Sequence, residues 1–181
     1  RVSVGDLVQN LKFRAFGAML LIFALPNALP ALPGTSAILG LPLLYLTFQL
    51  MLGRAAWLPG FISNRAMQRE DMAKLIARMS PWLHRAERLL VPRLLWVTSP
   101  SAERVIGALC LILAIVLVLP IPLGNMLPAL AISLMALGLL EKDGLWILLG
   151  ALVGLGSLVI VYGVLFAFMK ALVFVIVHAF S

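Results

Sequence analysis

The apolar positions of this chain form long runs that proline and glycine interrupt at two places, residues 26–36 and residues 120–125. Proline lacks the amide that a helix needs and glycine adopts almost any φ, whereas a following Thr, Ser or Asn can cap a new helix. Each apolar run is therefore predicted to be a helix, a break and a second helix, with each break at the tip of a helical hairpin.

The two hairpins, residues 7–54 and 104–144, are predicted to be an internal repeat. An ungapped offset of ninety residues aligns Arg14 with Arg104, Gly17 with Gly107, Pro30 with Pro120, Gly34 with Gly124 and Thr35 with Asn125. A competing offset of 98 aligns Asn27 with Asn125 but covers only six residues. The descending legs are short for a hydrocarbon layer of about 30 Å. Each hairpin is therefore either a pair of short spanning helices or, as we expect, a re-entrant hairpin with its tip inside the membrane.

The connector between the hairpins, residues 55–103, has a different pattern. Apolar residues recur there at helical spacing while Arg and Lys occupy the other positions, which predicts amphipathic helices. Ser80 and Pro81 are typical of a helix beginning, so two helices are predicted to meet there. Two placements are open, in the membrane interface or over the cytoplasmic mouth of the protein itself.

The last segment, residues 145–181, is almost entirely apolar. We expect one transmembrane helix near 145–168, with 170–181 either continuing it or folding back. Gly150 and Gly154 form a small-residue spacing that permits close helix packing in lipid. This spacing predicts either local packing or a homodimer.

The composition indicates an integral membrane protein, and with the predicted helices the fold class is all-α. It is 63% hydrophobic and only 12% charged, with a net charge of +7. Most charges lie in or beside the connector, which is therefore predicted to be cytoplasmic. Because these cations adjoin apolar segments, we expect them to meet anionic membrane lipids and no nucleic acid.

The same stretches resemble the ExoD family of membrane proteins associated with bacterial exopolysaccharide synthesis. The resemblance is carried by LPNALPALPGTSAILGLPLL at 25–44, QLMLGR at 49–54, LPIPLGNMLPALAISLMALGLLEKDG at 119–144 and WLP at 57–59. It covers nearly the full chain. It implies a multi-pass protein of the bacterial inner membrane with a part in polysaccharide production, and it implies no particular molecular activity.

The sequence predicts no enzyme, because it has no nucleophile with a base and no metal-ligand spacing, and because its one carboxylate pair, Glu141 and Asp143, is assigned a structural role. The seven acids are all assigned to polar positions, with Glu141 and Asp143 in a charge-paired loop beside Lys142. Cys110, the single cysteine, is assigned to packing. No cofactor and no metal are predicted.

The breaks are the predicted ligand site, because backbone left unpaired in a membrane must be buried in protein or face water. Helix N-termini bind phosphate, so the ligand would be a polyprenyl phosphate or another anion. The alternative is that these residues only cap their own helices. The predicted function is a small transporter or flippase-like protein, and the alternative is a non-transporting scaffold or regulator of polysaccharide synthesis. The predicted ligand-binding residues are Asn27, Gly34, Thr35, Ser36, Gly124 and Asn125.

Overall fold

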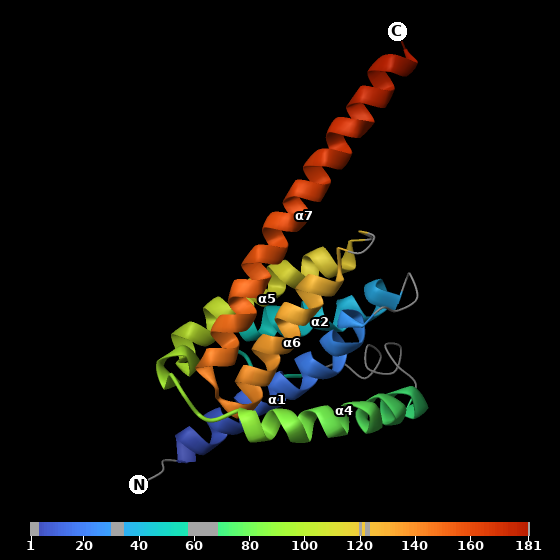
Figure 1. Cartoon of the computed structure of the whole chain (residues 1–181). Coiled ribbons are helices and arrows are strands. Elements are labelled where there is room, and N and C mark those ends of the chain that lie inside the picture. Colours follow the sequence, from blue (N-terminus) through green and yellow to red (C-terminus); the bar gives the residue numbers. More distant parts are fainter. Residues whose placement is uncertain (1–3, 30–34, 58–68, 120, 122–123, 181) are drawn as a thin grey trace.

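The computed structural model describes residues 4–29, 35–57, 69–119, 121 and 124–180, and it omits the side chains of 4–10, 35–37 and several positions of the helix 69–89. The described chain is helical throughout its regular structure (Figure 1). Its elements are α1 (Val4–Ala28), α2 (Thr35–Met51), α4 (Arg69–Leu89), the short 3-10 helix η1 (Leu95–Thr98), α5 (Pro100–Val118), α6 (Met126–Glu141) and α7 (Gly144–Ala179).

Four helices form an antiparallel bundle in which the legs of the two hairpins pair crosswise. Helix α1 packs mainly against α6, and α2 packs mainly against α5, while the two legs of each hairpin touch each other less. A Cβ added to Gly17 would lie 2.9 Å from the Cα of Leu140, and one added to Gly107 would lie 2.8 Å from the Cα of Met51. The helix pairs α1–α6 and α2–α5 are called here the cross-pairs. Within each of them the two helices approach each other equally closely, at glycines that correspond in the repeat.

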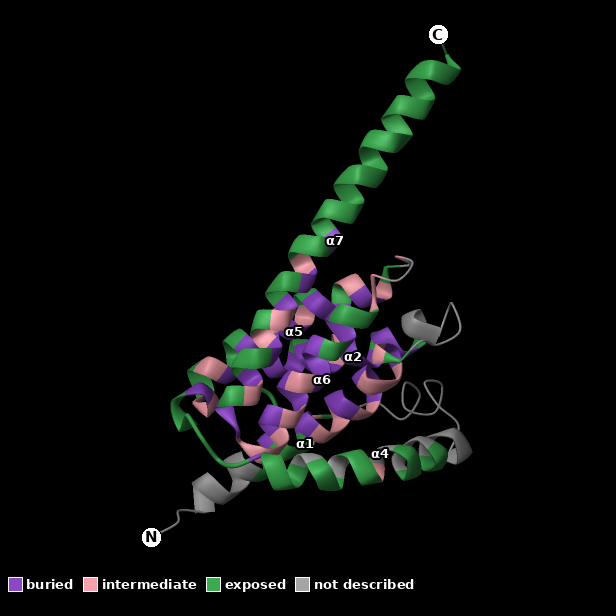
Figure 2. Cartoon of the chain, viewed as in Figure 1, coloured by how far each residue is buried: buried purple, intermediate pink, exposed green. Residues whose placement is uncertain are grey.

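The core lies between these four helices and is almost entirely apolar (Figure 2). Cys110 is fully buried there, with its Sγ 3.9 Å from the Sδ of Met135, so the cysteine packs as predicted. The largest fully buried side chains are Phe16, Leu20, Leu43, Leu46, Leu50, Leu113, Leu117, Ile132, Met135, Leu139 and Ile147.

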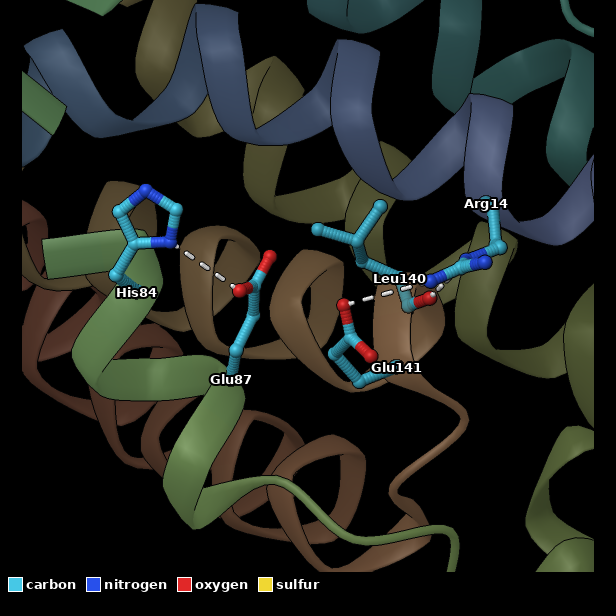
Figure 3. Close-up of polar contacts among 5 residues, drawn as sticks. All are labelled: Arg14, His84, Glu87, Leu140 and Glu141. Carbon is cyan, nitrogen blue, oxygen red and sulfur yellow. Dashed lines mark hydrogen bonds and ion pairs between the residues drawn. The ribbon is translucent and has the colours of Figure 1, made fainter. Parts of the chain in front are cut away.

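The bundle has two ends of different character. At the end called here the tip end, α1 and α5 finish and α2 and α6 begin. At the opposite end, called the charged end, Arg14 donates to the carbonyl of Leu140 at 3.2 Å and lies 3.8 Å from the carboxylate of Glu141 (Figure 3). Glu141 is thus charge-paired, as the sequence predicted.

The first legs of the hairpins match at the predicted offset of ninety residues, because α1 from 11 to 28 and α5 from 101 to 118 repeat nearly the same order of buried and exposed positions. The second legs match at 89 instead. Gly53 and Lys142 both have positive φ, and Arg54 and Asp143 bond to carbonyls five residues back. The alignment of Thr35 with Asn125 is therefore wrong by one residue, because the sequence could not place a one-residue difference between the connections.

Two predicted helix boundaries are wrong. Pro26 lies inside α1, which continues to Ala28, and Pro81 lies inside the single helix α4 where two helices were expected. A proline removes one hydrogen bond and bends a helix without always ending it. Helix α4 lies outside the bundle, and its described side chains are mostly exposed (Figure 2).

Helix α7 is continuous over 36 residues, so 170–181 does not fold back within the described chain. Its first half lies against the bundle, with Gly150 against Met135 and Gly154 against Leu113. The glycine spacing is therefore used for helix packing within the chain. Beyond Val161, the last buried residue, every described position is exposed.

Within the described ranges, three helices are long and apolar enough to cross a membrane, namely α1 from Leu11 to Ala28, α5 and α7. The other two bundle helices, α2 and α6, are apolar but have only 17 and 16 residues. At 1.5 Å per residue they reach about 25 Å, which is less than a hydrocarbon layer of about 30 Å.

Candidate functional site

The predicted site residues that the structure describes gather at the tip end. Asn27 lies in the last turn of α1, whereas Gly124 and Asn125 lead into α6. Helix α2 begins at Thr35, where the sequence placed a helix start. Gly34 and the side chains of Thr35 and Ser36 lie outside the described residues.

Asn27 is a buried amide with one half of its hydrogen bonding unfulfilled. Its side chain is 3% exposed, and its Nδ2 donates to the carbonyl of Phe23 at 3.0 Å. Its Oδ1 is buried and has no partner in the described part of the chain. Because the nitrogen is held by a carbonyl, the atom left without a partner is the acceptor.

Asn125 also has a bonded amide nitrogen and an unpaired amide oxygen, although its hydrogen-bond partners lie elsewhere in the chain. Its Nδ2 donates back to the carbonyls of Leu117 and Leu119, at 3.2 and 3.4 Å, at the end of α5. Its Oδ1 is buried and also lacks a partner among the described residues. The expectation that this side chain caps α6 is wrong, because its amide instead donates to carbonyls at the end of α5 and just after it.

Gly124 makes the tight turn before α6. Its amide donates to the carbonyl of Ile121 at 3.2 Å, and a Cβ added to it would lie 2.6 Å from the Cγ2 of Ile121. A side chain at this position would displace Ile121. The glycine therefore keeps the connection compact beside Asn125.

The two unpaired oxygens lie at the same end of one helix pair. Since Gly17 faces Leu140 and the helices run in opposite directions, Asn27 is level with the first turns of α6. Asn125 immediately precedes that helix, at the N-cap position. Two buried acceptor atoms thus belong to adjoining ends of α1 and α6.

An acceptor oxygen selects a ligand group that donates a hydrogen bond, such as a hydroxyl, and it repels a phosphate oxygen. Pro128, in the first turn of α6, also lacks one of the amides that an anion would use there. The two unpaired oxygens therefore match a hydroxyl donor and not a phosphate oxygen. They suit a ligand that carries hydroxyl groups.

The buried hydroxyls of the bundle, in contrast, have partners nearby. Thr47 donates to the carbonyl of Leu43 at 2.7 Å, and Ser133 donates to that of Ala129 at 2.8 Å. Hydroxyls of this kind are commonly satisfied by the preceding turn of their own helix. The oxygens of the two asparagines lack such a partner among the described residues, as does Oε1 of Glu103 at the other end of the bundle.

Among the acids whose side chains the structure describes, two are buried, contrary to the sequence prediction that all seven lie at polar positions. Asp143 is fully buried and accepts hydrogen bonds from the amides of Val91 and Leu145 at 3.1 and 3.0 Å. Its Oδ2 also lies 3.9 Å from the Nε of Arg93. Asp143 therefore caps α7 and joins the connector to it, in the charge-paired structural role that was predicted for this loop.

Glu103 is the second buried acid, with 2% of its surface exposed. Its neighbours one turn on, Ile106 and Gly107, are buried on the same face of α5. The signal in the sequence for this burial was the ninety-residue repeat, which aligns Glu103 with the apolar residue Phe13.

A helical bundle with helices of membrane-crossing length and large apolar side chains on its outer surface is the fold of a helical membrane protein. The family described as exopolysaccharide synthesis, ExoD, matches residues 1–163. The chain belongs to this ExoD family, as the resemblance predicted.

Two relatives are similar over most of the chain. An uncharacterised protein of Synechocystis sp. is 32% identical over 147 residues, which cover 80% of this chain and 69% of that protein. The protein ExoD of Rhizobium meliloti is 26% identical over 151 residues, which cover 81% of this chain and 63% of that protein. The chain thus spans less than two thirds of the ExoD protein. No solved structure matches it significantly.

Proposed function

We propose that this chain is a multi-pass protein of the bacterial inner membrane that supports exopolysaccharide synthesis as a small transporter or flippase-like protein. The observation that carries the proposal is the pair of buried, unpaired amide oxygens of Asn27 and Asn125 at the tip end. A buried acceptor without a partner is costly, so such atoms are retained where a ligand or water completes them.

The ligand that fits this site is a saccharide linked to a lipid phosphate. Its sugar hydroxyls would donate to the oxygens of Asn27 and Asn125, while its phosphate would lie near the amide groups at the beginnings of α2 and α6. The polyprenyl part would lie along the apolar outer surface of the bundle. Polyprenyl phosphate without a sugar would make only the phosphate contact.

The membrane placement proposed here is re-entrant, with the tip end inside the bilayer. The shortness of α2 and α6 supports this placement, as does the burial of polar groups where the helices break. The matching burial of α1 and α5 supports an internal duplication. Because both hairpins enter from the charged end, the two copies would be related by an axis along the bundle.

The test is movement of a fluorescent polyprenyl-diphosphate disaccharide across liposomes that contain the full chain. Asn27→Leu and Asn125→Leu should each reduce the rate at least tenfold, whereas Thr47→Val and Ser133→Ala should preserve it because those hydroxyls bond only to their own helices. A polyprenyl phosphate without sugar should move more slowly in the wild type. Equal rates for all four variants would overturn the site.

A second candidate function is a scaffold that binds the synthesis machinery through α4. It is favoured by the exposed cations of this helix, Lys74, Arg78, Arg85 and Arg88. Replacing the three arginines by glutamate should abolish pull-down of the synthesis proteins and leave lipid transport intact. Undiminished pull-down would remove this candidate.

A further inference from the structure

At the charged end, Glu103 carries a carboxyl oxygen that the bundle encloses without binding. The side chain is 2% exposed, and its Oε1 is buried without a hydrogen-bond partner in the described ranges. Asp143, the other buried acid, accepts two backbone amides and faces Arg93. An ionised carboxylate held like Glu103 is costly, whereas a protonated one is tolerated.

The charged groups that act on Glu103 are Lys12 from α1 and Arg104 from α5. The Nζ of Lys12 donates to the carbonyl of Gly53, just beyond α2. A Cβ added to Gly53 would lie 3.4 Å from the Nε of Arg104, so this guanidinium adjoins the same residue. Arg54, which follows, is exposed. The lysine is thus bound to a neutral carbonyl while an oxygen of Glu103 has no donor.

The fold itself has no need of an acid at this position. At the ninety-residue offset Glu103 corresponds to Phe13, which is also buried, at 4% exposed. The other seventeen aligned positions of α1 and α5, in the ranges 11–28 and 101–118, follow nearly the same order of burial. A phenyl ring therefore fills in one hairpin the place that a carboxyl group fills in the other.

We propose that Glu103 is a proton-binding site and that its proton decides the partner of Lys12. With the proton bound, Glu103 is a neutral carboxylic acid and Lys12 bonds to the carbonyl of Gly53, as in this structure. When the proton leaves to water, the Nζ of Lys12 moves to the carboxylate and the link from α1 to the end of α2 is released. The site lies at the charged end and is independent of any ligand at the tip end.

The test uses the full chain in lipid nanodiscs and measures the infrared absorption of protonated carboxyl groups as pH is raised. In the wild type, one infrared band from a buried protonated carboxyl group should disappear in a single transition as pH is raised. The control variant Glu87→Gln, which changes an exposed acid of α4, should lose the same band. Glu103→Gln should lack that band. Glu103→Phe, which copies Phe13 and so suits the fold, should lack it too. The same band in Glu103→Gln, or no band in the wild type, would overturn the proton site.

The exchange of partners has its own measurement, the nuclear magnetic resonance signal of the Lys12 Nζ, assigned with Lys12→Gln. In the wild type this signal should shift over the same pH range as the carboxyl band. In Glu103→Gln it should stay constant over that range. A shift of equal size in both proteins would show that Lys12 does not respond to Glu103, and it would overturn the coupling.

Discussion

Gly17 lies so close to Leu140 that a Cβ added to the glycine would come within 2.7 Å of the Leu140 amide nitrogen. Gly107 stands in the same relation to Met51 in the other cross-pair. In both places helix backbones touch without an intervening side chain. The bundle therefore depends on two glycines that the repeat places ninety residues apart.

Gly17→Ala and Gly107→Ala should each destabilise the chain by about 1–3 kcal/mol, because overpacking against backbone cannot be relieved by a rotamer change. The measurement is the midpoint of unfolding by sodium dodecyl sulfate in mixed micelles. The matched control is Gly156→Ala on α7, where a Cβ would meet no described atom within 4 Å. The control should be neutral or slightly stabilising, since alanine favours helix. Equal losses in all three would contradict the packing.

Cys110 should resist thiol reagents in the folded protein and react as it unfolds. The cysteine is the single one in the chain and is fully buried against Met135. Labelling with a maleimide dye across a denaturant series measures this directly. The labelling midpoint should coincide with the loss of helical circular dichroism. Rapid labelling without denaturant would show that the core opens there.

Asp143→Ala should destabilise the chain by about 3 kcal/mol, because it leaves the amides of Val91 and Leu145 without their acceptor and removes a helix cap. Asp143→Asn should cost about 1 kcal/mol less, since an amide oxygen can still accept from Leu145. Chemical unfolding in detergent measures both. A smaller loss for alanine than for asparagine would contradict the capping role.

Helix α4 should bind anionic membrane surfaces through its exposed cations. A dye attached at Trp82→Cys, in a Cys110→Ala background, should shift to shorter wavelength in anionic but not in neutral nanodiscs, because Trp82 is 71% exposed in the chain alone. Replacing Arg78, Arg85 and Arg88 by glutamate should abolish the shift. Raising salt should weaken it in the unreplaced protein. An identical shift in neutral nanodiscs would argue against charge as the cause.

Local chemistry predicted most of the helices. The breaks after residues 28 and 118 follow from proline and glycine, and the start of α2 at Thr35 agrees with the predicted beginning of the return segment. The long apolar run predicted a helix at 145–168, and the structure extends it to 179. The prolines at 26 and 81 were misjudged, because a helix interrupted at one hydrogen bond can continue when the rest of it is favourable.

What the sequence could not supply is the direction in which particular side chains face. Asn125 precedes a helix and so resembles a cap, but its amide turns back to carbonyls of α5. Glu103 stands beside an arginine and resembles a surface acid, but helix packing turns it inward. Only the pairing of α1 with α6 and of α2 with α5 fixes these orientations. That pairing is a contact between residues far apart in the chain.

The length of α7 makes the chain sensitive to the thickness of the bilayer. Its 36 residues form a rod of about 54 Å, nearly twice the usual hydrocarbon thickness of about 30 Å. Since the bundle buries nothing beyond Val161, the remaining apolar half of the rod overhangs it by about 27 Å. In a flat membrane this mismatch is relieved only by tilt, by local thickening or by neighbours along the rod. A change in lipid composition that alters bilayer thickness should therefore change the tilt of α7, and with it the orientation of the bundle that packs on its first half.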